Sequence, residues 1–262
     1  QQQQWVKTLK ALNQGFMDNP DKFNAYATQL TSDLQDYLPS LKSDSKYNYS
    51  DFIVSNIRET KKHLDIEWGG IKGAPKFPLP NALEYLLEAS YFSEDMDLRY
   101  FIRLSLLKMA NSGLYDQLGG GFARYSVDAK WKVPHFEKML YDNAQLISLY
   151  SKAYQIDKQA RYKEIIEESC AYISREMTHK ANGFYSAQDA DSDGVEGLFY
   201  VWKQSEIDDV LGEDSSIFNA YYQIDSNGNW ENELNILYPL ESTTDLLDKY
   251  QITANELKIK ID

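Results

Sequence analysis

Apolar residues recur every three or four positions along most of this 262-residue chain, and this spacing limits its fold more than any other feature. Such spacing places the apolar side chains on one face of an α-helix. Strands do not alternate with these segments, which argues against a doubly wound sheet and predicts antiparallel helix pairs. We expect helices over 5–16, 20–38, 53–64, 83–87, 98–109, 134–154 and 162–173, with shorter ones over 205–211, 215–222 and after residue 244.

Two short runs, 183–187 and 197–202, have the composition of β-strands, and an acidic loop between them could close a hairpin. A polar stretch over 40–49, rich in Ser, Asp, Lys and Asn, is typical of a linker. The sequence therefore predicts an all-α fold with a short β-hairpin. We expect the chain to divide into a helical segment over 1–39 and a larger domain over 40–262.

The charge balance argues against a nucleic-acid binder, because 40 Asp and Glu residues outnumber 27 Lys and Arg residues and leave a net charge of -13. There is no basic cluster that could hold phosphate groups. No apolar run approaches the roughly 18 residues that a membrane span requires. We therefore expect neither nucleic acid nor membrane as a partner.

Cys170 is the only cysteine, so the chain contains no internal disulfide, no redox pair and no cysteine zinc cluster. This usage is compatible with a cytoplasmic location. His63, His135 and His179 are too far apart in sequence to suggest a zinc triad. We expect neither a metal nor a cofactor.

The segment over 113–143 combines three consecutive glycines with several ionisable side chains. Glycines permit backbone conformations that other residues avoid, and ionisable groups beside them offer hydrogen bonds and proton transfer. A phosphate-binding loop does not fit, because no strand precedes the glycines and no Gly-Lys-Ser or Gly-Lys-Thr follows them. The ionisable residues are Asp116, Arg124, Asp128, His135, Glu137 and Asp142.

His135 is predicted one residue inside the helix that Pro134 opens. The positive end of the helix dipole favours a neutral imidazole, which can act as a base. Asp142 returns to nearly the same helix face, whereas Glu137 projects to another side. The alternative is that His135 only caps the helix and binds a loop.

The acidic segment over 189–196 places carboxylates at alternate positions before a glycine, as in the opening of a calcium-binding loop. The match then fails, because position twelve is Tyr200 where a bidentate Glu is required. A solvated hairpin loop, or a loop that lends Asp189 and Asp191 to a polar pocket, fits better.

Aromatic residues accompany the charged segment, among them Tyr125, Trp131, Tyr185 and Trp202. Aromatic faces beside carboxylates suit a sugar ring, which has an apolar C–H face and a rim of hydroxyl groups. Ordinary core packing can use the same side chains. Only their grouping with glycines and acids favours a pocket.

Several motifs, in this order, resemble the thioredoxin-domain-containing family related to spermatogenesis-associated protein 20. They are Gly73–Pro78, Tyr115–Phe122, Val133–Asp142, Tyr185–Asp191 and Glu196–Trp202. The resemblance implies an N-terminal thioredoxin-like domain followed by an (α/α) six-hairpin toroid, as in N-acylglucosamine 2-epimerases and many glycosidases. Residues 1–39 would then follow an absent thioredoxin-like domain, the partner of this region in the full-length protein. Residues 40–262 would form a partial toroid.

The resemblance implies a carbohydrate-active or carbohydrate-binding protein, by analogy with relatives of that fold. An epimerase or isomerase would use His135 as acid or base, while a glycoside hydrolase would use paired carboxylates. A non-catalytic scaffold beside the thioredoxin-like domain is the third possibility. The candidate catalytic residues are His135, Asp142, Asp116 and Asp189, and the candidate residues for binding a sugar-like ligand are Lys76, Arg124, Tyr125, Trp131, Glu137, Tyr185, Asp191 and Trp202.

Overall fold

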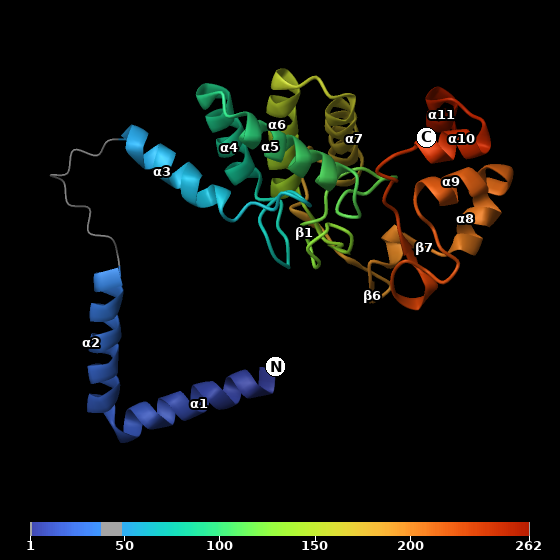
Figure 1. Cartoon of the computed structure of the whole chain (residues 1–262). Helices are drawn as coiled ribbons and strands as arrows, with labels where there is room; N and C mark the ends of the chain where they lie inside the picture. Colours follow the sequence, from blue (N-terminus) through green and yellow to red (C-terminus); the bar gives the residue numbers. More distant parts are fainter. Residues whose placement is uncertain (1, 38–48, 262) are drawn as a thin grey trace. The chain divides into compact units, whose positions relative to one another are not determined.

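The computed structural model describes residues 2–37 and 49–261 (Figure 1). The chain divides into two compact units, Gln1–Phe52 and Ile53–Asp262. The expected linker over 40–49 lies, except for its last residue, outside the described residues. In the first unit, α1 (Gln2–Asp18) and α2 (Pro20–Tyr37) form the two predicted helices, and Phe16 meets Phe23 edge to face.

The helical core of the second unit consists of helix pairs, as the spacing of apolar residues predicts (Figure 1). After α3 (Tyr49–Lys61), a short loop joins α4 (Pro80–Ser93) to α5 (Met96–Ala110), and another joins α6 (Leu140–Ile156) to α7 (Ala160–Glu176). Helix α4 packs against both α5 and α6. Their apolar faces form one core, whose fully buried members include Leu106, Met109, Leu146 and Tyr150. The mainly helical fold class is confirmed.

The prediction that a helix opens at Pro134 is wrong, because α6 begins at Leu140. Residues 134–139 are extended instead. Strand β2 (Pro134–His135) pairs with β1 (Tyr125–Ser126), and β3 (Lys138–Met139) pairs with β4 (Ala187–Gln188). Proline before a run with helical spacing is a local signal, and backbone hydrogen bonds to distant segments override it here.

The two predicted strand runs do not pair with each other. The first contributes β4, which binds β3, and the second contributes β7 (Val201–Trp202), which binds β8 (Asn235–Ile236). The short hairpin is formed by the acidic loop itself, from β5 (Asp191–Ser192) and β6 (Val195–Glu196). A 3-10 turn, η1 (Leu198–Tyr200), separates the hairpin from β7.

The C-terminal part contains the expected short helices, packed around α9 (Ser215–Tyr221). The other elements are α8 (Gln204–Leu211), η2 (Gly212–Asp214), η3 (Glu231–Glu233), α10 (Thr244–Tyr250) and α11 (Ala254–Ile261). Lys258 of α11 binds Glu164 of α7 at 2.7 Å and so connects this part to the helical core. Among the described residues, no helix is long and apolar enough to cross a bilayer, and no group of three potential metal ligands occurs.

Candidate functional site

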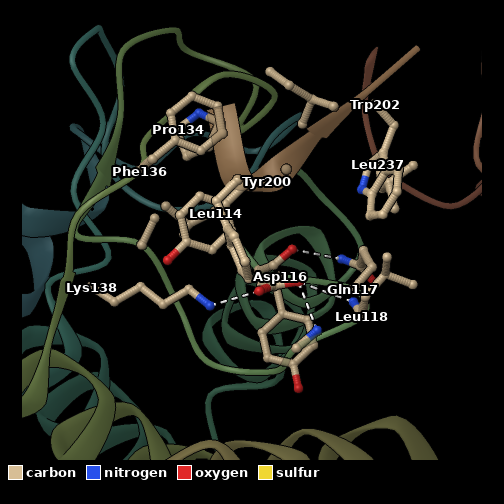
Figure 2. A pocket seen from close by; sticks show the side chains of 16 residues that line it. Leu114, Asp116, Gln117, Leu118, Pro134, Phe136, Lys138, Tyr200, Trp202 and Leu237 are labelled. Carbon is tan, nitrogen blue, oxygen red and sulfur yellow. Dashed lines mark hydrogen bonds and ion pairs between the residues drawn. The ribbon is translucent and has the colours of Figure 1, made fainter. Parts of the chain in front are cut away.

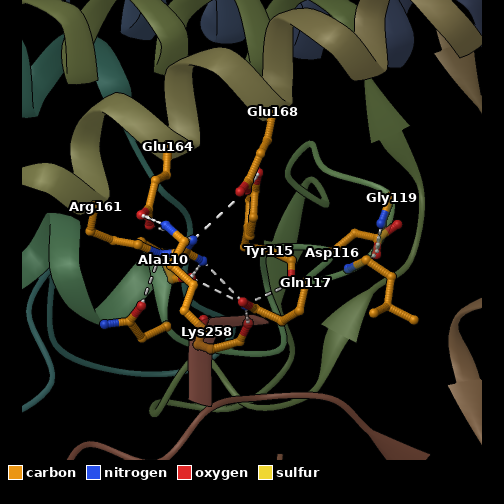
Figure 3. A network of polar contacts seen from close by, with 12 residues as sticks. Ala110, Tyr115, Asp116, Gln117, Gly119, Arg161, Glu164, Glu168 and Lys258 are labelled. Atoms are coloured by element: carbon orange, nitrogen blue, oxygen red, sulfur yellow. Dashed lines mark hydrogen bonds and ion pairs between the residues drawn. The ribbon is translucent and has the colours of Figure 1, made fainter. Parts of the chain in front are cut away.

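A polar network holds the loop that follows α5 (Figure 3). The Tyr115 hydroxyl donates to Glu168 of α7 at 2.6 Å, and burial raises the pKa of this hydroxyl well above its usual value. The Gln117 amide donates to the carbonyl oxygens of Ala110 at 3.1 Å and Ser112 at 2.9 Å. Arg161 donates to the Gln117 amide oxygen at 3.0 Å. The loop is therefore fixed before any ligand arrives.

Within this loop, Asp116 forms a nearly buried ion pair with Lys138 of β3. Lys138 Nζ lies 2.8 Å from Asp116 Oδ2 and donates to the Gly120 carbonyl at 2.8 Å, and its side chain is 3% exposed. Burial lowers the pKa of Lys138, while Asp116 acts in the opposite direction. Asp116 Oδ1 accepts hydrogen bonds from the backbone of Leu118 and Gly119. A Cβ at Gly119 would lie 2.6 Å from Asp116 Oδ2, so this close approach requires glycine.

A cavity of about 400 Å³, here named the Lys138 pocket, opens above this ion pair. Figure 2 shows the Asp116 and Lys138 side chains meeting on one side of the pocket, with Trp202 and Leu237 on the other. Most of its remaining wall is apolar or aromatic, from Leu114, Pro134, Phe136, Tyr200 and Ile236. The Tyr115 loop and residues 134–138 thus converge on one cavity.

The extended conformation of residues 134–138 decides which side chains reach this pocket. Alternate residues of a strand point to opposite faces. Pro134, Phe136 and Lys138 line the pocket, whereas His135 and Glu137 contact residues on the opposite side. His135 and the candidate Asp116 therefore lie on different faces of one segment.

On the opposite face, His135 belongs to a stack of three rings. Its imidazole lies 4.9 Å from the Tyr125 ring, which lies 4.8 Å from the Phe77 ring. The His135 Nε2 atom is 3.8 Å from Glu196 Oε1. Its Nδ1 atom is buried and has no hydrogen-bond partner within the part of the chain that the structure describes. An unpaired buried nitrogen is costly, which makes it a functional candidate.

A second hollow of about 380 Å³, here named the Arg124 cleft, lies on this side. Arg124, Tyr141, Asp142 and Gln145 supply its polar groups, and Phe77 with the neighbouring 78–82 segment supplies the rest. The Arg124 guanidinium lies 3.5 Å from Glu137. The cleft thus gathers charged groups with an exposed aromatic face.

Asp142 is the most strongly perturbed carboxyl group of the cleft. Burial raises its pKa from 3.8 to about 6, against the opposing effects of Arg124 and Tyr141. Its Oδ2 atom is buried, and no described residue donates a hydrogen bond to it. Shifted pKa values and unpaired polar atoms in a cleft are typical of functional sites.

Two predicted ligand-binding residues are buried inside the protein instead. Lys76 is 2% exposed, and its Nζ binds Asp65 at 2.6 Å and the Ala129 carbonyl at 3.0 Å. Trp131 is fully buried and donates to the Trp68 carbonyl at 2.8 Å. A ligand would have to break these bonds to reach either side chain.

The acidic hairpin contributes none of its predicted carboxylates to the two hollows. Asp189 and Asp191 are exposed, and the Asp191 backbone donates to Asp189 Oδ1 at 3.1 Å. Tyr185 is also exposed and lies beside the ring of His179. Three residues that follow the hairpin, Phe199, Tyr200 and Trp202, line the Lys138 pocket instead.

Sequence reasoning missed Lys138, Phe136, Tyr200 and Tyr141. The signal for Phe136 was the apolar–polar alternation of residues 134–137, which the stronger helical spacing of the residues after 139 concealed, whereas Lys138 interrupts this alternation. Tyr141 and Tyr200 lie within the motifs over 133–142 and 196–202, but the motifs do not predict where either side chain lies. Their placement depends on how distant segments pair.

Comparisons with known proteins relate the chain to proteins that are longer than itself. Spermatogenesis-associated protein 20 of Homo sapiens is 42% identical over 159 residues, covering 57% of this chain and 20% of that protein. An uncharacterised protein of Caenorhabditis elegans, B0495.5, is 33% identical over 245 residues, covering 82% of this chain and 34% of that protein. The chain therefore spans about a fifth to a third of these relatives. No protein-family model matches it.

Solved structures similar to the chain include a sugar epimerase from a ruminal bacterium and cellobiose 2-epimerase from Bacillus thermoamylovorans. The first has a TM-score of 0.46 and 16% identity, covering 63% of this chain and 45% of that chain. The second has a TM-score of 0.45 and 14% identity, covering 53% of this chain and 41% of that chain.

Proposed function

This chain is homologous to a segment of spermatogenesis-associated protein 20, and we propose that its Arg124 cleft binds a sugar-like molecule and transfers a proton next to the sugar carbonyl. The homology does not by itself assign an activity to this chain. The proposal therefore rests on the chemistry of the cleft, and above all on Asp142.

Asp142 supports the proposal because its carboxyl group has a pKa of about 6 and a buried oxygen that no described residue binds. A catalytic base works best when its pKa lies near the working pH, since it is then ionised and still able to accept a proton. Above about pH 6 the Asp142 carboxylate is available as a base. Once protonated, it can return a proton to the face of the substrate carbon from which the proton was taken, which exchanges that proton with solvent.

The other groups of the cleft suit a sugar carbonyl. Removing a proton beside a carbonyl places negative charge on the carbonyl oxygen, and a guanidinium stabilises such charge. Arg124 is 44% exposed in its side chain, so it can reach a ligand while it contacts Glu137. The Phe77 ring offers an apolar face for the C–H side of a sugar.

His135 keeps an acid or base role in this proposal, although it does not line the cleft. Its ring is joined to the cleft through Tyr125 and Phe77, and its free Nδ1 atom can donate or accept a proton. We assign Asp142 the first proton transfer and His135 the second.

Hydrogen exchange in D₂O tests this directly. The chain is incubated with a panel of aldoses, ketoses and uronic acids, and deuterium incorporation beside the carbonyl is followed by NMR. We expect incorporation with the wild type and its loss in Asp142→Asn. Asp189→Asn, which changes an exposed carboxylate outside the cleft, serves as the matched control. Equal incorporation in Asp142→Asn and the wild type would show that Asp142 is not the base, and cleaved products would indicate hydrolysis instead.

The alternative of a non-catalytic scaffold is favoured by the two buried ion pairs. The ion pairs of Lys138 with Asp116 and of Lys76 with Asp65 fix loops and occupy lysines that a ligand could otherwise contact. A scaffold predicts that no sugar raises the melting temperature. It also predicts that His135→Ala changes stability without changing any ligand response.

A further inference from the structure

The geometry points to a second binding site in the Lys138 pocket, which takes a neutral ring-shaped polyol such as a monosaccharide. This inference does not depend on the proposed chemistry of the Arg124 cleft. The two hollows share no lining residue, and the extended segment over 134–138 lies between them. A ligand in one hollow would therefore be held by a different set of side chains from a ligand in the other.

The ion pair in this pocket argues for a neutral ligand. Lys138 Nζ already binds Asp116 and the Gly120 carbonyl, and it lies 4.5 Å and 4.8 Å from the ring centres of Tyr172 and Tyr200. An ammonium has three N–H groups, and Asp116 with the Gly120 carbonyl occupies two of them, so at most one remains for an anion. Because the charges of Lys138 and Asp116 cancel, the pocket has little attraction for a charged molecule.

Two hydrogen-bonding groups in the pocket remain available to a ligand. A carboxylate accepts about four hydrogen bonds, and Asp116 receives two from the backbone and one from Lys138. Its side chain is 16% exposed, and it lines the pocket. The Tyr200 hydroxyl also has no hydrogen-bond partner among the described side chains and backbone groups. One free acceptor beside one free hydroxyl suits a pair of sugar hydroxyl groups.

The walls of the pocket suit the apolar face of a sugar ring. Phe136 and Tyr200 are stacked 5.8 Å apart at an interplanar angle of 11°, and Trp202 adds a third ring (Figure 2). The volume of about 400 Å³ falls in the range of small-molecule sites, which are mostly apolar with a few placed polar groups. The pocket therefore offers hydrogen-bonding groups for the hydroxyls of a pyranose ring and an apolar surface for its C–H face.

Isothermal titration calorimetry of the chain tests this site, with glucose, mannose, N-acetylglucosamine and myo-inositol as probes and glucuronate as the anionic comparison. Tyr200→Phe retains the stacked ring and removes only the hydroxyl, so we expect affinity for the bound neutral sugar to fall about three- to tenfold. Trp202→Phe should also weaken binding. Asp116→Asn is unsuitable, because it leaves Lys138 buried without its counter-ion.

Asp142→Asn provides the control, since it alters the Arg124 cleft and leaves every residue of the Lys138 pocket unchanged. The second-site inference requires that this variant bind the neutral sugar as tightly as the wild type. It is overturned if no neutral probe binds, if Tyr200→Phe weakens glucuronate binding as much as glucose binding, or if Tyr200→Phe has no effect on the neutral sugar. Loss of deuterium exchange in Asp142→Asn with unchanged titration would support both proposals separately.

Discussion

Replacing Asp142 by Asn should make the protein more stable above pH 6, although it removes the proposed base. The reason is that folding holds the Asp142 pKa at about 6, compared with 3.8 for a free side chain. Between these values the unfolded chain ionises Asp142 while the folded chain still keeps the proton. The contribution of Asp142 to stability is therefore greatest below about pH 4, decreases as the pH rises towards 6, and stays lower above it.

The size of this effect follows from the shift in pKa. A change from 3.8 to about 6 corresponds to about 3 kcal/mol. Asp142 is only half buried, so solvent screening reduces this to about 1–2 kcal/mol. Asn is neutral at every pH and carries no such penalty. For a unit the size of Ile53–Asp262, the gain corresponds to a rise in melting temperature of about 2–8 °C at pH 7.5.

Urea unfolding followed by tryptophan fluorescence measures the difference at pH 4 and pH 7.5. Four of the five tryptophans, Trp68, Trp131, Trp202 and Trp230, lie in the second unit, so the signal reports mainly on the unit that contains Asp142. Asp189→Asn is the control, and its stability should stay within about 0.5 kcal/mol of the wild type at both values.

The reasoning is refuted if Asp142→Asn is no more stable than the wild type at pH 7.5. It is also refuted if the gain is the same at pH 4, because the penalty on the carboxylate should have disappeared there. A gain confined to the higher pH would show that Asp142 is held in an unfavourable state by the cleft. Such a cost is typical of functional residues.

Two further substitutions test the packing around the sites. Lys138→Met leaves Asp116 without its buried partner and should destabilise the protein by about 3–5 kcal/mol in the same urea assay. Adding Asp116→Asn should restore part of this loss. If Lys138→Met caused no loss of stability, the ion pair would not be structural. Gly113→Ala places a Cβ 2.0 Å from the Lys132 carbonyl oxygen and should lower the free energy of unfolding by about 2–3 kcal/mol. Gly183 has open space around it, so Gly183→Ala should change this free energy by no more than about 0.5 kcal/mol. Equal melting temperatures for the two glycine variants would contradict this reading.

The helical elements could be predicted because their signal is local. Residues such as Leu98, Ile102 and Met109 fall on one face of a helix regardless of what they pack against. The same applies to the short helices near the C-terminus. The recognisable motifs around Tyr115 and Pro134 also marked the region in which both hollows lie.

The division of that region into two sites could not be predicted, because it depends on pairing between distant segments. Lys138 pairs with Gln188 across the β3–β4 ladder, and His135 pairs with Tyr125 across β1–β2. A strand turns successive side chains to opposite faces, whereas the expected helix would have placed His135 and Asp142 on one face.

The sequence by itself determined that this protein is built from helix pairs and that its ionisable and aromatic residues gather between Tyr115 and Tyr200. Only the tertiary structure decided that Lys138 is neutralised by Asp116 and that Asp142 is held at a raised pKa beside Arg124. The physical reason is that helix periodicity depends on residues that are near neighbours along the chain. Burial and charge pairing are set by residues that folding brings together from far apart.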